Sequence, residues 1–334
     1  MTEARAARPT LAKVARLANV STATASNVLT GKGRVSPETV ARVLHAARQV
    51  GYRTHTGARA LSIGSTTSVG VLVPSSVDVL IRERQSFFWI RLLDAFVTRC
   101  SELEVTTTIV NEAQAQSMID SGIDVLVLLG RHDADTIEAL QVPFGLPVVS
   151  SQSFGDIDAD VPTHDAAAIA TAVVGEFARL NRSVIAWMPG PFADAVAGWE
   201  AALSAAADEC GMNVIAVGHD DTFESLESAL TTGETAAVDA VFGLFRNPRF
   251  LIEALRTSGR RVPDDVAVIV QSEGILEEVT TPTLSNLSLC GAHCGDLLAE
   301  RAVSMGRRED VVIAGMPSEL VRRESTSIDN EQRR

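Results

Sequence analysis

Two apolar patterns of helical period near the start of the chain constrain its fold more than any other feature. Four apolar residues recur three or four positions apart and predict a first helix with one buried face: Leu11, Val14, Ala15 and Ala18. Asn19 and Val20 interrupt this pattern. Ser21 predicts the start of a second helix, because its hydroxyl can accept a backbone N–H of the first helical turn.

The second predicted helix has a polar face of short side chains. Its apolar face is formed by Ala25, Val28 and Leu29. The opposite face carries Thr22, Ala23, Thr24, Ser26 and Asn27. Short side chains let a groove floor approach the helix closely. Two helices around a three-residue turn, the second with a polar outward face, are typical of the helix-turn-helix, whose second helix enters the major groove of DNA.

A third helix follows a basic turn at Gly31-Lys32-Gly33. Ser36 predicts its cap, Pro37 lies in its first turn, and the helical pattern runs to about Gln49. Gly51 ends this helix, and Tyr52 follows it. A linker over residues 54–65 comes next and contains the short run Ala58-Arg59-Ala60-Leu61.

The run over residues 14–39, followed by Gly51-Tyr52-Arg53-Thr54 and Ala58-Arg59-Ala60-Leu61, resembles the N-terminal headpiece of the lactose/galactose-repressor (LacI/GalR) family of bacterial transcription regulators. The resemblance is close over about the first sixty residues and looser, in order and length, over the remainder. A helix-turn-helix pattern alone is weakly specific. The third helix and the Ala58–Leu61 tail at the matching distance make the resemblance specific.

The resemblance implies DNA contacts along this headpiece. It implies that Thr22, Ala23 and Asn27 read bases, with Asn27 standing where the family usually has arginine or another long donor. Asparagine favours adenine over guanine, so an unusual half-site is expected. Residues expected to contact phosphates or to support the helices are Ser21, Thr24, Ser26, Thr30, Ser36 and Thr39. Further DNA-binding candidates are Thr10, Leu11, Arg34, Tyr52, His55 and Ala58.

The linker matches a hinge helix that orders on operator DNA in this family. Two hinges, one from each subunit, enter the central minor groove, and Leu61 matches the leucine that acts as an apolar wedge between base steps. A plain spacer of threonine, glycine and serine is the alternative interpretation. His55 and Gly57 stand where longer or more helix-prone residues are common, which favours a weaker hinge helix.

The charge of the chain is distributed unevenly. Residues 1–60 hold ten Lys and Arg against Glu3 and Glu38, a net charge of +8, whereas the whole chain carries −13 and the remainder therefore −21. A basic segment on an acidic body is typical of nucleic-acid binding by the basic part. We expect residues 1–9 to be a basic tail.

Nothing in the sequence predicts a membrane segment, a metal or a cofactor. No apolar run approaches the length of a bilayer span, and residues 1–9 lack the apolar centre of a signal peptide, so we expect a cytoplasmic, nucleoid-associated protein. Cys290 and Cys294 are spaced for one helical face, but further metal ligands at suitable spacing are missing. We therefore expect the four cysteines to be ordinary buried thiols.

Beyond residue 66 the pattern changes to short apolar runs that alternate with helical stretches. The runs cover residues 69–73, 105–110, 125–129, 148–150, 184–188, 214–217, 238–244 and 266–270. Continuous apolar strands between helices predict parallel sheets with both faces covered. Two sets of about four strands predict two lobes, and chain order and length are similar to the periplasmic-binding-protein fold of the family.

The predicted fold is therefore an all-α helix-turn-helix headpiece plus an α/β two-lobed periplasmic-binding-protein-like domain with parallel sheets. The expected parts are the basic tail (residues 1–9), the DNA-binding headpiece (10–53), the hinge or linker (54–65) and an effector-binding and dimerisation domain (66–334).

The expected ligand cleft departs from the family pattern. Ala195 stands where the family commonly has the arginine that clamps its effector, three residues before Gly198-Trp199. Phe245-Arg246-Asn247-Pro248 replaces an Asn-Asp pair, Gln271-Ser272-Glu273 replaces Gly-Phe-Asp, and Ser150-Ser151-Gln152 replaces Asp-Arg. Carboxylates and a bidentate arginine bind vicinal hydroxyls or an anionic effector. Their joint loss argues against a typical sugar effector.

Three interpretations of the cleft stay open: a different small-molecule effector, a second protein as regulator, or no effector. The candidate effector-binding residues are Ser75, Phe88, Ser151, Trp187, Ala195, Trp199, Phe245 and Ser272. Aromatic residues at strand ends are more often part of the core.

No catalytic constellation emerges, because a P-loop, a Gly-x-Gly-x-x-Gly turn and a nucleophile elbow are all missing from the sequence. We expect a sequence-specific DNA-binding regulator that is a homodimer or a higher oligomer, a repressor of a near-palindromic operator, and not an enzyme. The alternative is a small-molecule binding protein in which the headpiece only localises the chain.

Overall fold

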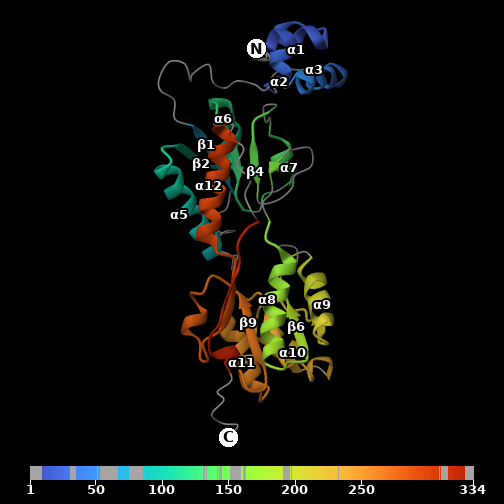
Figure 1. Cartoon of the computed structure of the whole chain (residues 1–334), viewed down its shortest axis with the longest axis vertical. Coiled ribbons are helices and arrows are strands. Elements are labelled where there is room, and N and C mark those ends of the chain that lie inside the picture. The colour runs from blue at the N-terminus through green and yellow to red at the C-terminus, as the bar shows by residue number, and fades with distance from the viewer. Residues whose placement is uncertain are drawn as a thin grey trace, which may run out of the picture. The chain divides into compact units, whose positions relative to one another are not determined.

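The computed structural model describes residues 10–30, 35–50, 52, 67–74, 86–130, 132, 134–140, 142, 145–150, 159–160, 163–190, 196, 198–231, 233–307, 309 and 315–327. The chain divides into two compact units (Figure 1). The first unit comprises residues 1–76, 97–162 and 298–313, and the second unit comprises residues 77–96, 163–297 and 314–334.

The headpiece is a three-helix module made of α1 (Leu11–Ala18), α2 (Thr22–Leu29) and α3 (Pro37–Val50), as the sequence predicts. Its core is formed by small and branched side chains from all three helices, with Val14, Leu29 and Val43 fully buried. Asn19 ends α1 in the left-handed conformation with φ of 53°. Asparagine tolerates this conformation better than most residues, which lets the chain turn sharply into α2.

The first unit contains a parallel sheet in the order β2-β1-β3-β4-β5. Its strands are β1 (Ser68–Val73), β2 (Thr106–Asn111), β3 (Val125–Leu128), β4 (Val148–Ser150) and β5 (Ala159–Asp160). Its other elements are α5 (Ser86–Glu102, shared with the second unit), η1 (Glu112–Gln114), α6 (Ala115–Ser121) and α7 (Ala134–Glu138). Met118 and Ile119 of α6 pack with Leu126 and Leu128 of β3 in one buried cluster.

The second unit contains a six-stranded sheet in the order β11-β10-β9-β8-β6-β7. Its strands are β6 (Val184–Met188), β7 (Asn213–Ala216), β8 (Ala240–Gly243), β9 (Ala267–Gln271), β10 (Ser285–Ser288) and β11 (Glu319–Val321). All neighbours are parallel except β10 and β11, which are antiparallel. Each of the eight predicted strands is present, whereas β5, β10 and β11 were not predicted.

Helices cover this second sheet. They are α8 (Ala166–Arg179), α9 (Trp199–Glu209), α10 (Phe223–Thr231) and α11 (Pro248–Thr257), with the short turns η3 (Gly233–Thr235), η4 (Glu277–Val279) and η5 (Glu324–Thr326). Leu226 of α10 and Leu251 of α11 pack against Val241 and Val268 of the strands. Cys210, which follows α9, is exposed and Cys290 is half-buried, which corrects the expectation that all four cysteines are buried.

The helix α12 (Gly291–Arg307) packs closely against α5, and both helices contribute residues to both units (Figure 1). A Cβ at Gly295 would clash with the carbonyl oxygen of Leu92, so only glycine permits this approach. Further along the pair, Arg99 donates to Glu300 at 2.6 Å. Among the described residues, no helix is both long and apolar enough to cross a membrane.

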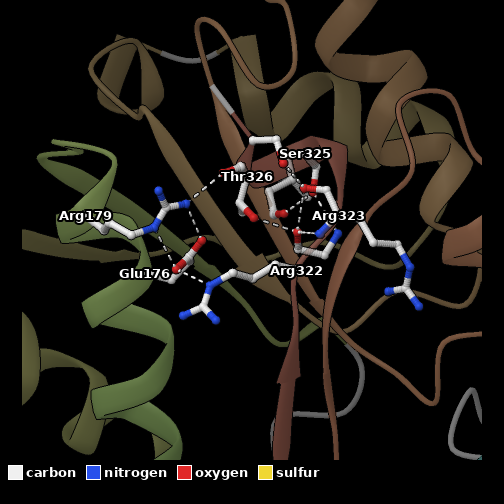
Figure 2. A network of polar contacts seen from close by, with 9 residues as sticks. Glu176, Arg179, Arg322, Arg323, Ser325 and Thr326 are labelled. Atoms are coloured by element: carbon white, nitrogen blue, oxygen red, sulfur yellow. Dashed lines mark hydrogen bonds and ion pairs between the residues drawn. The ribbon is translucent and has the colours of Figure 1, made fainter. Parts of the chain in front are cut away.

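The C-terminal segment of the described chain is held to α8 by a buried carboxylate (Figure 2). Glu176 is 2% exposed and accepts hydrogen bonds from Arg179 and Arg322. Arg179 also donates to the carbonyl oxygen of Thr326 at 3.1 Å. Burial acts to raise the pKa of Glu176, but the two guanidinium groups outweigh it and lower that pKa. The carboxylate is therefore held in its charged form.

Candidate nucleic-acid interface

The helix α2 presents the side chains that the sequence assigns to base reading. Thr22, Ala23 and Asn27 are exposed, whereas Ala25 and Leu29 are fully buried against the other headpiece helices. Ser26 lies at the margin of the exposed face. The exposed face is narrow and bears no charge, so its chemistry is that of hydroxyl, methyl and amide groups. These groups recognise base edges in the major groove.

Serine hydroxyls cap the helices that flank this face. Ser21 Oγ accepts the backbone N–H of Thr24 at 3.0 Å and lies 2.8 Å from Thr24 Oγ1. Ser36 repeats the arrangement at α3, where its Oγ donates to Thr39 Oγ1 at 2.9 Å. The paired hydroxyls satisfy one N–H at each helix start. The first turn of α2 contains no acidic residue, so its positive end favours a phosphate, whereas Glu38 lies in the first turn of α3.

Three further residues predicted to contact DNA differ in their exposure and in their hydrogen bonds within the headpiece. Thr10 is exposed and caps α1, since its Oγ1 accepts the N–H of Lys13 at 3.3 Å. Leu11 is half-buried against the core, and Thr30 donates its hydroxyl to the carbonyl of Ser26 at 2.8 Å. These three residues therefore have local structural roles whatever they contact on DNA.

Tyr52 lies in the headpiece core rather than on its surface. Only 9% of the residue is exposed, and burial raises the pKa of its hydroxyl. Its backbone N–H donates to the carbonyl of Ala47, which fixes the chain at the end of α3. Several predicted residues lie outside the described part of the chain: Arg34, His55, Ala58, Leu61, Ser75, Ser151 and Ala195.

The aromatic candidates for effector binding are buried in the second unit. Trp187 is 1% exposed, and its ring centroid lies 5.3 Å from that of Phe242. Trp199 stacks on the same Phe242 with an interplanar angle of 3°. Phe88 is also buried, and Phe245 is fully buried beneath the imidazole of His219. The structure thus places these rings in the core, the alternative that the sequence analysis held open.

The last described candidate, Ser272, is half-buried just after β9, where its Oγ accepts the N–H of Gly274 at 3.2 Å. This hydroxyl serves to shape the turn that follows the strand. Its position at the carboxyl end of a parallel strand agrees with the region at which such sheets bind ligands.

Two polar groups at strand ends, one buried and one half-buried, were not singled out from the sequence. In the first unit, His132 Nδ1 lies 3.0 Å from Glu112 Oε1, and the imidazole is fully buried. In the second unit, His219 Nδ1 accepts the N–H of Asp221 at 3.1 Å. The only signal in the sequence is that each polar residue follows an apolar run by a few positions.

Comparison with known proteins supports the same two parts of the chain. Residues 10–55 match the model of "Bacterial regulatory proteins, lacI family", and residues 194–326 match that of the "Periplasmic binding protein-like domain". The HTH-type transcriptional regulator CelR of Thermobifida fusca is 28% identical over 347 residues, which cover 96% of this chain and 99% of CelR.

Solved structures of related regulators share the fold. A transcriptional regulator CelR–cellobiose complex superposes with a TM-score of 0.62 at 22% identity, covering 95% of this chain and 100% of that one. The lac repressor dimer bound to operator and the anti-inducer ONPF superposes with a TM-score of 0.62 at 18% identity, covering 96% of this chain and 99% of that one. The relatives are transcriptional regulators and not enzymes. The chain therefore has a lacI-type helix-turn-helix headpiece and a periplasmic-binding-protein-like domain, and it is similar over nearly its whole length to DNA-binding transcriptional regulators of the LacI family.

Proposed function

We propose that this protein is a homodimeric repressor that binds a near-palindromic operator and acts on the bacterial chromosome in the cytoplasm. The observation that carries the proposal is the uncharged exposed face of α2, on which Thr22, Ala23 and Asn27 project from a helix whose other side is buried. A closed dimer presents two such helices related by a two-fold axis. Two inverted half-sites are the DNA sequence that matches this symmetry.

The proposed DNA contact of each headpiece residue follows from the chemistry of its side chain. Asn27 offers both a donor and an acceptor, which pair with N7 and N6 of adenine. Ala23 offers a methyl group, which suits the methyl group of thymine. Ser21 and Ser36, each at a helix start, are suited to phosphate oxygens. In this proposal Leu61 wedges the minor groove at the operator centre.

We also propose that the regulating signal differs from a typical neutral sugar. CelR and the lac repressor are described in complex with cellobiose and ONPF, respectively. In this chain the aromatic rings near the strand ends of the second unit are packed into its core. This arrangement supports a regulator whose control differs from that of these two relatives.

Selection of bound sequences from random DNA by the full chain tests the proposal. The expected result is an inverted repeat with adenine at one symmetric position of each half-site. Asn27→Ala should relax the preference at that position alone, at a cost of about 1–3 kcal/mol. Gln49→Ala, an exposed change at the end of α3, serves as the matched control. An asymmetric consensus, or none, contradicts the proposal.

A further inference from the structure

Three donors from the turn that joins β10 to α12 converge on the carboxylate of Glu273. The backbone N–H of Leu289 donates to Oε1 at 3.0 Å, and that of Gly291 donates to Oε2 at 3.1 Å. The hydroxyl of Ser288 donates to Oε2 at 3.3 Å. Both carboxylate oxygens are therefore engaged by groups that lie 15 to 18 residues later in the chain.

The turn that supplies these donors has the geometry of an anion-binding site. Cys290 between the two N–H groups has φ of 53°, the left-handed conformation that is uncommon for a residue with a side chain. With Cys290 in this conformation, the N–H groups of Leu289 and Gly291 on either side of it point to the same carboxylate, an arrangement that binds anions. Gly291 also begins the 17-residue helix α12, whose positive end adds to the attraction.

The backbone of this turn is held in place from the other side. A Cβ at position 291 would lie 2.7 Å from the carbonyl oxygen of Phe88 in α5, so the close approach requires glycine. Ser288 also accepts the N–H of Cys290 at 2.9 Å. The turn is therefore held by contact with α5 as well as by its own hydrogen bonds.

Glu273 lies two residues after β9, at the carboxyl end of the parallel strands, the edge at which such sheets bind ligands. Other described polar groups at this edge are likewise engaged within the chain. His219 bonds Met188 and Asp221, Asp221 accepts the N–H of Arg246, and Asn247 caps α11. A hydroxyl-rich ligand binds by pairing its hydroxyl groups with such side chains. Here part of their hydrogen-bonding capacity is taken up by bonds within the chain.

We propose that Glu273 is a built-in anion that occupies the anion-binding turn at the start of α12 and so closes the ligand edge of the second unit to neutral sugars. A sugar that bound this edge would have to displace the Glu273 carboxylate from its three hydrogen-bond donors. A neutral sugar carries no negative charge with which to replace it. The DNA affinity of the regulator is then insensitive to neutral sugars. This effect on DNA affinity rests on the proposed function, whereas the occupation of the turn by Glu273 does not depend on it.

Rescue by a free carboxylate tests the occupied turn directly. Glu273→Ala in the full chain empties the concavity, so the midpoint of thermal unfolding should fall by at least about 3 °C. Sodium acetate should restore part of that loss, relative to sodium chloride at the same ionic strength, because acetate binds the folded variant. The wild type and Glu224→Ala, which removes an exposed carboxylate from the first turn of α10, should show no acetate-specific gain.

A failure of acetate to stabilise Glu273→Ala more than chloride overturns the proposal. If Glu273→Ala does not fold, Glu273→Gln tests the role of the charge instead, because the amide keeps the shape of the side chain without its charge. Acetate should then have no effect on the Gln variant, whose side chain still fills the turn, while its unfolding midpoint lies below that of the wild type. A Gln variant as stable as the wild type contradicts the role of the charge.

Calorimetric titration of the full chain with cellobiose and with ribose tests the regulatory consequence. No binding is expected in the millimolar range, and neither sugar should change the affinity for selected DNA. Saturable binding of either sugar to the wild type, with altered DNA affinity, overturns it. Loss of DNA binding without any sugar would instead contradict the proposed function and leave the acetate result standing.

Discussion

The Nε of Arg322 donates a 2.7 Å hydrogen bond to Oε2 of Glu176, although the two residues are 146 positions apart in the chain. The carboxylate is fully buried on α8, whereas the two arginines that bind it, Arg179 and Arg322, are each more than half exposed. Figure 2 shows that the contact continues through Arg179 to Thr326. The segment after β11 is thereby fastened to the second unit by charge as well as by strand pairing.

Removing this charge should destabilise the protein. Glu176→Gln should lower the free energy of unfolding by about 1–3 kcal/mol, since a charged acceptor is replaced by a neutral one while the exposed arginines regain water. Urea unfolding followed by circular dichroism measures the change. Glu209→Gln, at the exposed end of α9, is the matched control and should have little effect. Equal stability of the two variants would count against the role of the contact.

The same carboxylate should make stability depend on pH in the acid range. Its folded-state pKa lies below the ordinary value of 4.5, so unfolding takes up a proton in acid. The stabilisation is fully present above that value and is lost as pH falls through the folded-state pKa. The difference between wild type and Glu176→Gln should therefore shrink as the pH is lowered from about 5 into the acid range. A difference that stays constant over this range would contradict the assignment.

Cavity formation in the headpiece should abolish DNA binding. Leu29 is fully buried at the end of α2, and Leu29→Ala should cost about 2–5 kcal/mol in a module with a small core. The matched control is Leu17→Ala on α1, because Leu17 is 47% exposed and its removal leaves no cavity. Electrophoretic mobility shift with selected DNA measures the DNA affinity of the two variants, and thermal unfolding measures their stability. Equal DNA affinity of both variants would show that α2 is not the reading element.

Two substitutions at Ser21 separate its cap from its expected phosphate contact. Ser21→Ala removes the acceptor for the Thr24 N–H and should cost about 0.5–2 kcal/mol of stability. Ser21→Asp keeps a good cap, so stability should be retained, but its charge repels phosphate and should weaken binding to every DNA sequence alike. If Ser21→Asp binds DNA as tightly as the wild type, Ser21 does not face the phosphate backbone.

The fold could be predicted wherever its signal is local. The headpiece helices follow from apolar spacing and hydroxyl caps, and β6 follows from five consecutive apolar residues. By contrast, β10 reads Ser-Asn-Leu-Ser and escaped prediction, although Ser285 and Asn286 are buried. Their burial depends on partners contributed by the chain end, since Ser285 Oγ lies 2.7 Å from Thr326 Oγ1.

The candidate sites likewise differ in whether they depend on local sequence patterns or on contacts between distant parts of the chain. Exposure of Thr22 and Asn27 follows from helical period alone, so these positions could be assigned from the sequence. The engagement of Glu273 could not, because its donors belong to a turn whose conformation depends on Cys290 and on contact with α5. Likewise, the burial of Trp187 reflects its packing with Phe242 across neighbouring strands, which a single strand pattern does not encode.

The most direct test of DNA reading by α2 compares Asn27 with Asn27→Arg on two operators that differ at one symmetric base pair. Arginine pairs with guanine and asparagine with adenine, so the preferred operator should switch from adenine to guanine at that position. The predicted result is a reversal of relative affinity, about 1–3 kcal/mol for each half-site, in competition binding at fixed salt. An unchanged preference in the variant would contradict the assignment of Asn27, and of α2, to base recognition.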